Sequence, residues 1–600
     1  MCGISAVVAL EGVKACSLDD CYEESLNKQL DESLDTIKHR GPDARGQWLS
    51  KDSRVALGHV RLAINDLTPA GEQPFHDSNG SVHAVVNGEI YGYDELRREL
   101  GDSYNFKGDS DCEIVIALYL HYGLHFLSKL RGEFALCIYD ARQQFFVAAR
   151  DRYGIKPLFW TVVDNRLLVA AEAKAFLPLG WKPEWDVRSI VEDGWLHDER
   201  TLFKGVHKIR PGFYMTCSSF GYMAHRQYWD LDFPDKRHLE IRSEEEMILG
   251  VRERLLDAVK VRLRADVPVG IYLSGGIDSA VVAGMATHLI EEEGIKMNGA
   301  GCNKNKRLLT CFGIGFEKGT EFDEAPIAQR TADRLGLPFV MKRMNEQSLA
   351  DNFEAATWHS EHHNPDLNSV AKFALSELPR EHGFKVILSG EGSDEHFGGY
   401  SHFLPDSLRE PDLAWRPPTI SDKRREELAA IKESECQPGY KGIDRKFVAA
   451  GPPTPRRMLN NTSISSCLWT VTMAEFAPWT KIYGDLTVQQ ARANNPDGRI
   501  LDQINTKWHP LHTSQYVWIK SILPNLILTC MGDRMEMAHS IEGRPPFLDH
   551  HLTEYVNHLP PSLKARPDPH TGQVVEKWIL REASKPFITT ELYERKKHVR

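Results

Sequence analysis

Short apolar runs that end in glycine-rich turns recur along the second half of the chain. The run from Val267 to Leu273 predicts a short buried strand, followed by the turn Ser274-Gly-Gly276 and by a helix from Ala280 to Leu289. Leu309 to Phe316 predicts a second buried strand, and a third begins at Lys385 and ends in a glycine-rich, acidic loop. Strands that alternate with helices are typical of a parallel α/β sheet.

The first half shows a different pattern, in which strands alternate with turns as far as about Tyr214. Apolar stretches at Ile4 to Leu10, Gly58 to Asn65 and Ala84 to Tyr91 predict strands. The first would be an edge strand if Cys2 is only a small residue that opens it. Gly108 to Glu113 predicts the start of an amphipathic helix that runs to about Tyr122. This half therefore predicts a sheet-rich domain.

The chain of 600 residues exceeds the size at which single cores stop growing, which predicts more than one domain. We place the domains at residues 1–230 and 243–600, with a polar linker at 231–242. Ser243 and Glu246 form a capping-box pattern, which predicts a helix running to about Arg264. Residues 406–462 are charged, rich in proline and weakly periodic, and predict a surface insertion.

Composition narrows the class of protein. With 42% hydrophobic residues, 26% charged residues and a net charge of −11, the chain resembles a soluble enzyme and lacks the basic surplus of a nucleic-acid-binding protein. Apolar runs are too short to span a membrane, and the N-terminus lacks the basic region of a signal peptide. The scattered cysteines suit a reduced compartment, so we expect a cytoplasmic protein.

The turn Ser274-Gly275-Gly276 has the features of an anion cradle. Glycines allow close approach of the backbone, and the N–H groups and dipole of the following helix face negative charge. Because no lysine follows the glycines, the loop fits a fold that releases pyrophosphate better than one that transfers a γ-phosphate. The alternative is an ordinary strand–turn–helix connection with a capping serine.

Cys2 combines a nucleophile with a special position. Removal of Met1 would leave its thiol and a free α-amine on one residue, and an α-amine titrates near pH 8, so that it can act as a general base. The alternative is a small residue that opens an edge strand.

Three further segments carry candidate chemistry in the first half. Arg61 lies within an apolar run, where a cation needs either a buried acid or an incoming carboxylate. Asn87 and Gly88 provide a side-chain amide and a backbone N–H, which can form an oxyanion hole. Asp111 lies at a predicted helix start, where it could equally be a cap.

These segments together resemble a known family. Cys2-Gly-Ile, His39-Arg-Gly-Pro-Asp, Arg61-Leu, Asn87-Gly-Glu-Ile-Tyr and Ser110-Asp-Cys-Glu resemble the glutaminase domain of class II, N-terminal-nucleophile amidotransferases, and the second half resembles the ATP-dependent domain of asparagine synthetases. The resemblance implies an antiparallel β-sandwich of the N-terminal-nucleophile type, joined to a parallel-sheet ATP-pyrophosphatase domain. It also implies the glutamine-binding residues, which are Arg61, Leu62, Ala63, Ile64, Asn65, Asn87, Gly88, Glu89 and Asp111.

Within that resemblance each glutaminase residue has an expected role. Cys2 would attack the glutamine carboxamide, and Asn87 and Gly88 would hold the oxyanion. Arg61 would bind the α-carboxylate, and Asp111 the α-amine with help from Glu89. Glutamine is thus an expected substrate.

The resemblance also implies a second centre that uses ATP and Mg²⁺. Asp278 and Asp394 follow strand ends and are suitable Mg²⁺ ligands, although both could be solvated loop acids. Glu391 would act as a general base. Lys577 would be the cation that contacts pyrophosphate. The alternative is that Lys577 and Arg581 are only a surface pair one helical turn apart. The expected ATP-binding residues are Ser274, Gly275, Gly276, Asp278, Ser279, Ile314, Ser389 and Gly390. Met531 to Asp549 would be structural support for this centre.

The identity of the acceptor acid is the open point. Aspartate is the first expectation, but Leu367 occupies the position where asparagine synthetases often carry an arginine, and Lys342 and Lys372 are the nearest cations in sequence. The alternatives are another carboxylic acid and, from a different class, a non-catalytic homologue. A β-lactam-forming relative is disfavoured, because it has tyrosine in place of Glu391 and lacks the N-terminal cysteine. A homodimer is possible.

Overall fold

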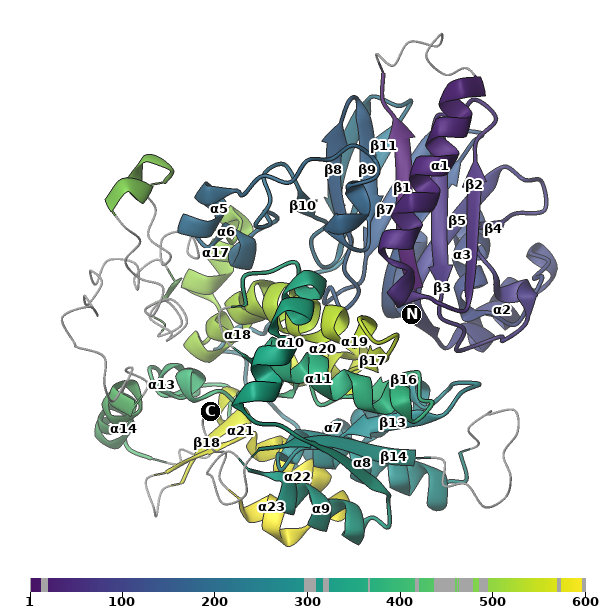
Figure 1. Ribbon diagram of the computed structural model, residues 1–600. Coiled ribbons are helices and arrows are strands. Elements are labelled where there is room, and N and C mark those ends of the chain that lie inside the picture. Colours follow the sequence, from purple (N-terminus) through teal and green to yellow (C-terminus); the bar gives the residue numbers. More distant parts are fainter. Residues whose placement is uncertain are drawn as a thin grey trace.

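The computed structural model shows two domains joined along a broad seam (Figure 1). It describes residues 2–11, 20–295, 309–316, 323–364, 367–415, 420–435, 459–460, 462, 478–484, 495–568 and 573–595. The N-terminal domain, purple to blue, is built on antiparallel sheets, and the second domain, teal to yellow, on a parallel sheet.

The N-terminal domain is a sandwich of two six-stranded antiparallel sheets. The first sheet has the order β10-β8-β9-β1-β3-β2, from His207–Lys208, Phe159–Val163, Arg166–Ala170, Cys2–Ala9, Val55–Arg61 and Ala44–Leu49. The second has the order β12-β11-β7-β6-β5-β4, from Tyr222–Gln227, Phe213–Ser218, Phe145–Arg150, Arg131–Asp140, Val82–Tyr91 and Phe75–His76. Alternate side chains such as Ile4, Val85 and Val169 fill the space between the sheets. The predicted sandwich is confirmed.

Helices cover the outer faces of the sandwich. Leu26, Leu30 and Leu34 of α1 (Asp20–Thr36) pack on the first sheet, and α2 (Tyr93–Leu100) and α3 (Ile114–Tyr122) cover the second. The helix predicted as amphipathic is buried at every residue from Ile114 to Tyr119. It packs against the second sheet and against the apolar residues of the segment that follows it, such as Phe126 and Leu127. Asp111 belongs to a short 3₁₀ turn before this helix.

Strand β1 is not the edge strand that the sequence suggested. It lies between β9 and β3, and all of its residues are buried. Register pairs Cys2 with Arg61 of β3, so the predicted nucleophile and the predicted carboxylate-binding cation lie on adjacent strands.

The second domain contains a five-stranded parallel sheet in the order β15-β14-β13-β16-β17. These strands are Phe339–Arg343, Leu309–Gly315, Val269–Tyr272, Val386–Leu388 and Glu542–Arg544. The three predicted buried strands are thus confirmed within one or two residues. Helix α7 (Glu244–Arg262) starts at the predicted capping box, in which Glu246 N donates to Ser243 Oγ at 3.1 Å. Helix α8 (Ile277–Glu291) follows the glycine turn.

Further helices enclose this sheet. They include α9 (Ala325–Arg334), α10 (Glu346–Ser360), α11 (Asn368–Glu381), α12 (Ser393–Phe397), α18 (Pro510–Lys520), α19 (Arg534–Met537), α20 (His550–Asn557), α21 (Pro561–Lys564), α22 (Trp578–Ser584) and α23 (Thr590–Glu594). A π-helix, Leu523–Asp533, leads directly into α19.

The proposed linker and insertion are partly packed. Leu231 and Phe233 are buried, and Trp508 Nε1 donates to the carbonyl of Phe233 at 3.1 Å. At the start of the insertion, Asp406 is buried on α13 (Leu404–Ser407), and α14 (Asp422–Glu435) follows. Residues 416–419, 436–458 and 461 of the insertion, and Asp366, lie outside the described residues. Among the residues that are described, no helix is long and apolar enough to cross a membrane.

Candidate active sites

The first candidate site surrounds Cys2 at the start of β1. Cys2 is buried, and its backbone N–H donates to Asn87 Oδ1 at 2.8 Å. This bond orients the amide of Asn87, whose buried Nδ2 has no hydrogen-bond partner within the described residues. A buried donor without a partner costs free energy unless a ligand accepts its hydrogen bond, and an oxyanion would do so.

Gly88 and the thiol complete this corner of the site. Gly88 has φ of +152°, and a Cβ there would lie 1.9 Å from the carbonyl oxygen of Glu133, so only glycine fits. Burial raises the pKa of the Cys2 thiol, and the positive charge of Arg61 opposes this rise. A thiol whose pKa is raised needs a base to become a nucleophile.

Arg61 is buried and held by backbone carbonyls rather than by an acid. Its guanidinium donates to Thr68 O at 2.9 Å and to the carbonyls of Asn65 and Asp66. No carboxylate among the described residues lies within 4 Å of it as an ion-pair partner. The charge is therefore available for a carboxylate ligand.

The loop after Arg61 is fixed by contacts to both domains. Leu62 and Ile64 pack into the core of the second domain, so these residues offer only their backbone to a ligand. Ala63 N donates to Asp43 Oδ2 at 2.8 Å, and Asp66 N donates to Asp266 Oδ2 at 2.9 Å.

Two buried acids, Asp111 and Glu89, also belong to this candidate site. Asp111 accepts a hydrogen bond from Ile90 N at 2.7 Å, so it does not cap the helix that follows, and burial raises the pKa of its carboxyl. Glu89 accepts from the Asn65 amide and forms a 3.0 Å ion pair with Arg544. Burial raises the pKa of Glu89, and Arg544 opposes this.

Arg544 was missed by the sequence reasoning, and it comes from β17 of the other domain. Glu542 and Arg544 lie two residues apart on this strand and contact each other at 2.5 Å. The spacing of Glu542 and Arg544 could have indicated this contact. Residues at i and i+2 of a strand lie on the same face, and charged side chains on a buried face need partners from other parts of the chain.

The second candidate site lies where β13 ends. Ser274 N and Ser274 Oγ both lie 3.0 Å from Ser279 Oγ, and Gly276 N donates to Ser274 Oγ at 3.1 Å. A Cβ on Gly275 would lie 2.7 Å from the Cβ of Glu324, so the loop is tightly packed. The 15-residue helix α8 begins directly after this turn, so the free N–H groups of its first turn lie beside the loop.

Neighbouring strands contribute the rest of this site. Ile314 lies on β14, adjacent to β13. Ser389 N donates to the carbonyl of Arg544 at 3.2 Å, and a Cβ on Gly390 would lie 2.9 Å from the Cβ of Asp278. The predicted ATP residues therefore lie at the carboxyl ends of three adjacent strands, in the turns that follow them, or in the first turn of α8.

Asp278, Asp394 and Lys577 converge here from distant parts of the chain. Lys577 Nζ lies 2.7 Å from Asp278 Oδ2 and 2.8 Å from Asp394 Oδ1. Burial alone would lower the pKa of Lys577, but the two carboxylates outweigh it and raise the pKa. Lys577 precedes α22 in a left-handed conformation, and Arg581 donates instead to the carbonyls of Glu576 and Tyr593. The two residues are thus not a surface pair.

The two carboxylates fit a hard cation in part. Both present oxygens toward one point, as their contacts with a single ammonium nitrogen show. Within the described part of the chain, no group of three or more histidine, cysteine or acidic side chains could hold a metal ion. Further ligands would have to come from phosphate oxygens and water, which is the usual arrangement for Mg²⁺.

Glu391 and Lys372 form the remaining side of this site. Lys372 Nζ lies 3.1 Å from Glu536 Oε1, 4.0 Å from Glu391 Oε1 and 4.1 Å from the ring centroid of Tyr272. Leu367 is about half exposed at the start of α11, and Lys342 pairs with Glu377. Of these two lysines, only Lys372 reaches Glu391.

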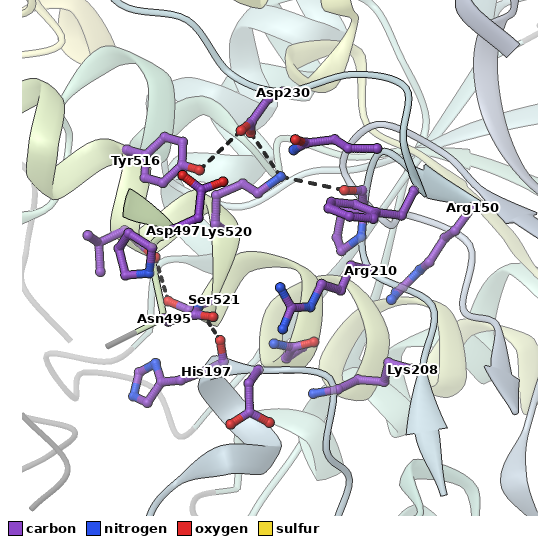
Figure 2. A pocket seen from close by; sticks show the side chains of 17 residues that line it. Arg150, His197, Lys208, Arg210, Asp230, Asn495, Asp497, Tyr516, Lys520 and Ser521 are labelled. Carbon is purple, nitrogen blue, oxygen red and sulfur yellow. Dashed lines mark hydrogen bonds and ion pairs between the residues drawn. The ribbon is translucent and has the colours of Figure 1, made fainter. Parts of the chain in front are cut away.

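A small cavity lies between the domains. Figure 2 shows it lined by Lys208, Arg210, Asp230 and Lys520, with Lys520 Nζ 3.0 Å from Asp230 Oδ1. Its volume of about 90 Å³ is far below the 300–1,000 Å³ of typical ligand pockets.

The fold and these two candidate centres are typical of enzymes in which an amidotransferase domain is joined to an ATP-using synthetase domain. The family model "Asparagine synthase" matches residues 250–599, and the model "Glutamine amidotransferase domain" matches residues 1–229. The chain therefore belongs to the asparagine synthase family, as its motifs predicted.

Curated relatives match nearly the whole chain. "Amidase chry2" of Gibberella zeae is 48% identical and covers 100% of this chain and 88% of its own length. "Amidase chyE" of Penicillium rubens is 47% identical over 99% of this chain and 87% of its own. "Asparagine synthetase [glutamine-hydrolyzing] 1" of Bacillus subtilis is 29% identical over 96% of this chain and 83% of its own.

Proposed function

We propose that this protein transfers the amide nitrogen of glutamine to a carboxylic acid other than aspartate, at the expense of ATP. Glutamine is hydrolysed at Cys2, and the ammonia passes through the interior to the second site. There ATP activates the acid as an acyl-adenylate with loss of pyrophosphate, and ammonia displaces AMP to give a primary amide. The geometry of Asn87 beside Cys2 carries the glutaminase half of this proposal.

The glutaminase half follows from that geometry. The Cys2 thiol attacks the carboxamide carbon while the α-amine, freed by removal of Met1, accepts its proton. The oxygen becomes negatively charged, and Asn87 Nδ2 donates to it because Asn87 Oδ1 is already held by the Cys2 nitrogen. The α-amine returns the proton to the departing nitrogen, and water then hydrolyses the thioester. Arg61 and Asp111 bind the two ends of the amino acid.

The synthetase half uses the carboxyl ends of the parallel strands. The loop Ser274–Gly276 and the start of α8 bind phosphates, and Asp278 and Asp394 would hold Mg²⁺. That ion, when bound, neutralises phosphate charge as pyrophosphate leaves. The Lys577 ammonium occupies the point between the two carboxylates. It would be displaced from there by Mg²⁺ and would then pair with the phosphates. Glu391 accepts a proton from the attacking nitrogen.

The surroundings of Lys372 favour an acceptor with one carboxylate. Aspartate brings a second carboxylate, and burying it without a cation costs several kcal/mol, on the order of the penalty for an unpaired ion. Lys372 is already paired with Glu536 at 3.1 Å, and Leu367 supplies no charge. Relatives named amidases are 48% and 47% identical, against 29% for an asparagine synthetase, which supports a different acceptor.

The separation of the two centres gives the test. We expect Cys2→Ala to abolish pyrophosphate release with glutamine and to leave release with added ammonia near the wild-type rate, because the synthetase site contains no part of Cys2. Pyrophosphate release is measured with each nitrogen source, ATP and a panel of carboxylic acids. Equal loss with both nitrogen sources would refute the two-site mechanism, and a wild-type protein inactive with every acid would indicate a non-catalytic homologue.

A further inference from the structure

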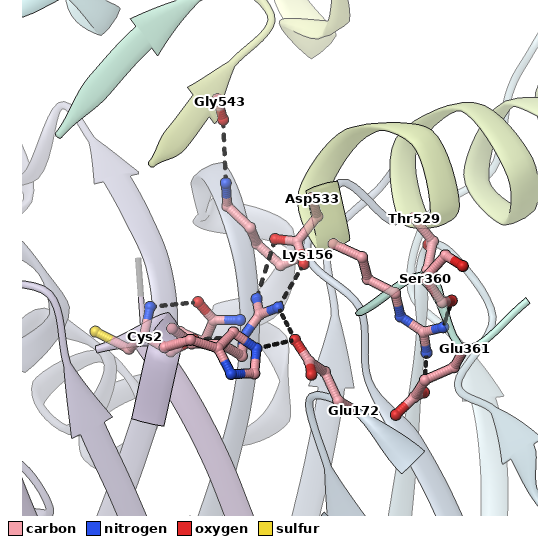
Figure 3. A network of polar contacts seen from close by, with 12 residues as sticks. Cys2, Lys156, Glu172, Ser360, Glu361, Thr529, Asp533 and Gly543 are labelled. Atoms are coloured by element: carbon pink, nitrogen blue, oxygen red, sulfur yellow. Dashed lines mark hydrogen bonds and ion pairs between the residues drawn. The ribbon is translucent and has the colours of Figure 1, made fainter. Parts of the chain in front are cut away.

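A single fully buried arginine, Arg40, connects the nucleophile residue to the synthetase domain. Figure 3 shows the network to which its partners Cys2, Glu172 and Asp533 belong. Arg40 Nε donates to the backbone carbonyl of Cys2 at 3.1 Å. Its other nitrogens donate to Glu172 Oε1 at 2.7 Å and to the two oxygens of Asp533 at 2.8 and 3.1 Å. Asp533 is the last residue of the π-helix that precedes α19. The bidentate contact fixes the plane of the guanidinium as well as its position.

The contacts around Arg40 form a larger buried network across the domain seam. Arg534 pairs with Glu361 at 2.6 Å, and Glu361 accepts from the backbone nitrogens of Ala173 and Lys174 at 2.9 and 2.7 Å. The Lys174 ammonium lies 3.1 Å from Glu361 and also contacts Glu172.

The charges of this network balance. It contains three cations (Arg40, Lys174 and Arg534) and three carboxylates (Glu172, Glu361 and Asp533). Both domains contribute to it, since Glu361, Asp533 and Arg534 come from the second domain. Loss of one carboxylate would leave a buried cation without its partner and so would change the position of the remaining groups.

We propose that Asp533 is a positioning residue for glutamine hydrolysis, supplied to the glutaminase site by the synthetase domain. It acts through Arg40: the Asp533 carboxylate holds the guanidinium, the guanidinium holds the Cys2 carbonyl, and the Cys2 backbone sets the thiol against Asn87. Because Arg544 from the same domain pairs with Glu89, the docked second domain completes this site at two points. This inference rests on the proposed glutaminase function.

Replacement of Asp533 with asparagine gives the test. Asp533→Asn keeps the size of the side chain but removes the charge, so Arg40 is free to turn toward Glu172. We expect the kcat for glutamine hydrolysis, measured as glutamate formed without ATP or acceptor, to fall roughly 10- to 100-fold, as small misplacements of reacting groups do. We expect KM for glutamine and ammonia-dependent pyrophosphate release to stay within about twofold of wild type. Asp533→Glu, which keeps the charge, should recover part of the loss.

A second interdomain ion pair provides the matched control. Lys520 and Asp230 pair at 3.0 Å, with side chains 14% and 12% exposed, in the cavity of Figure 2. Lys520→Met breaks this pair without touching Arg40, so it should leave the ratio of glutamine to ammonia activity unchanged. Its melting temperature and that of Asp533→Asn report general loss of stability.

Three outcomes would overturn the proposal. The first is that Asp533→Asn hydrolyses glutamine at the wild-type rate. The second is that this variant loses glutamine- and ammonia-dependent activity equally. The third is that Lys520→Met changes the ratio of glutamine to ammonia activity as much as Asp533→Asn does. A wild-type protein that hydrolyses no glutamine while still using ammonia would refute the proposed glutaminase and, with it, this role for Asp533.

Discussion

At the scale of single residues, Gly399 shows how closely the synthetase site is packed. A Cβ there would lie 1.9 Å from Lys577 Cε and 2.2 Å from Asp394 Oδ1. We expect Gly399→Ala to displace both groups and to lower ATP–pyrophosphate exchange by about tenfold or more, while glutamate formation at Cys2 stays unchanged. Gly498, whose Cβ would meet nothing within 4 Å, is the matched control. Unaltered exchange in Gly399→Ala would contradict the assignment of Lys577 and Asp394 to this site.

Lys208, a buried ammonium on the seam, makes stability depend on pH. Burial lowers the pKa of Lys208 to about 7, although the charge of Asp198 opposes this, and its Nζ donates to the Trp195 carbonyl at 2.6 Å. Between about pH 7 and its usual pKa near 10.4, the unfolded chain binds a proton that the folded chain lacks. The free energy of unfolding therefore rises with pH across this window, by at most about 1.4 kcal/mol per unit.

Substitution of this lysine isolates its contribution. We expect the free energy of unfolding to rise less between pH 7 and pH 9 in Lys208→Met than in the wild type. It is measured by unfolding in denaturant at each pH. Lys204→Met is the control, because Lys204 is exposed and its hydrogen-bonded ion pair with Glu184 raises its pKa instead of lowering it. An identical slope in Lys208→Met and wild type would show that Lys208 does not titrate in this range.

At the scale of elements, local pattern predicted which segments are strands but not which strands are neighbours. The glycine turn after β13 and the capping box of α7 depend on adjacent residues, and both are observed close to their predicted positions. The interior place of β1 depends on its pairing with β9 and β3, whose residues are remote in sequence. Hydrophobic pattern alone does not contain this information.

The segment from Met531 to Asp549 shows the same limit for the candidate sites. The sequence suggested that it supports the synthetase centre, and Glu536 does contact Lys372 there. Asp533 and Arg544, however, contact Arg40 and Glu89 of the glutaminase domain. Motifs predicted the residues expected to contact substrate, because these occur in short ordered runs. Asp533 and Arg544 lie more than 400 residues from Arg40 and Glu89 along the chain, so these contacts could be found only in the folded protein.

At the scale of the whole molecule, several ion pairs that are buried or mostly buried cross the seam between the domains. Arg262 contacts Glu133 at 2.9 Å and Asp549 at 2.8 Å, and Arg131 contacts Asp549 at 2.9 Å. Such pairs contribute little net stability but require one relative placement of the charges, because each unpaired ion is costly. The seam thus favours one arrangement of the domains, which the proposed passage of ammonia between the two sites would require.

The identity of the acceptor tests the central claim most directly. AMP, pyrophosphate and amide product are measured for the wild-type protein with glutamine and ATP, comparing aspartate with monocarboxylic acids at matched concentrations. Since Lys372 is paired with Glu536, we expect a monocarboxylic acid to yield AMP and its primary amide in equal amounts, and aspartate to give little AMP. Saturation by aspartate, with asparagine as the product, would contradict the account.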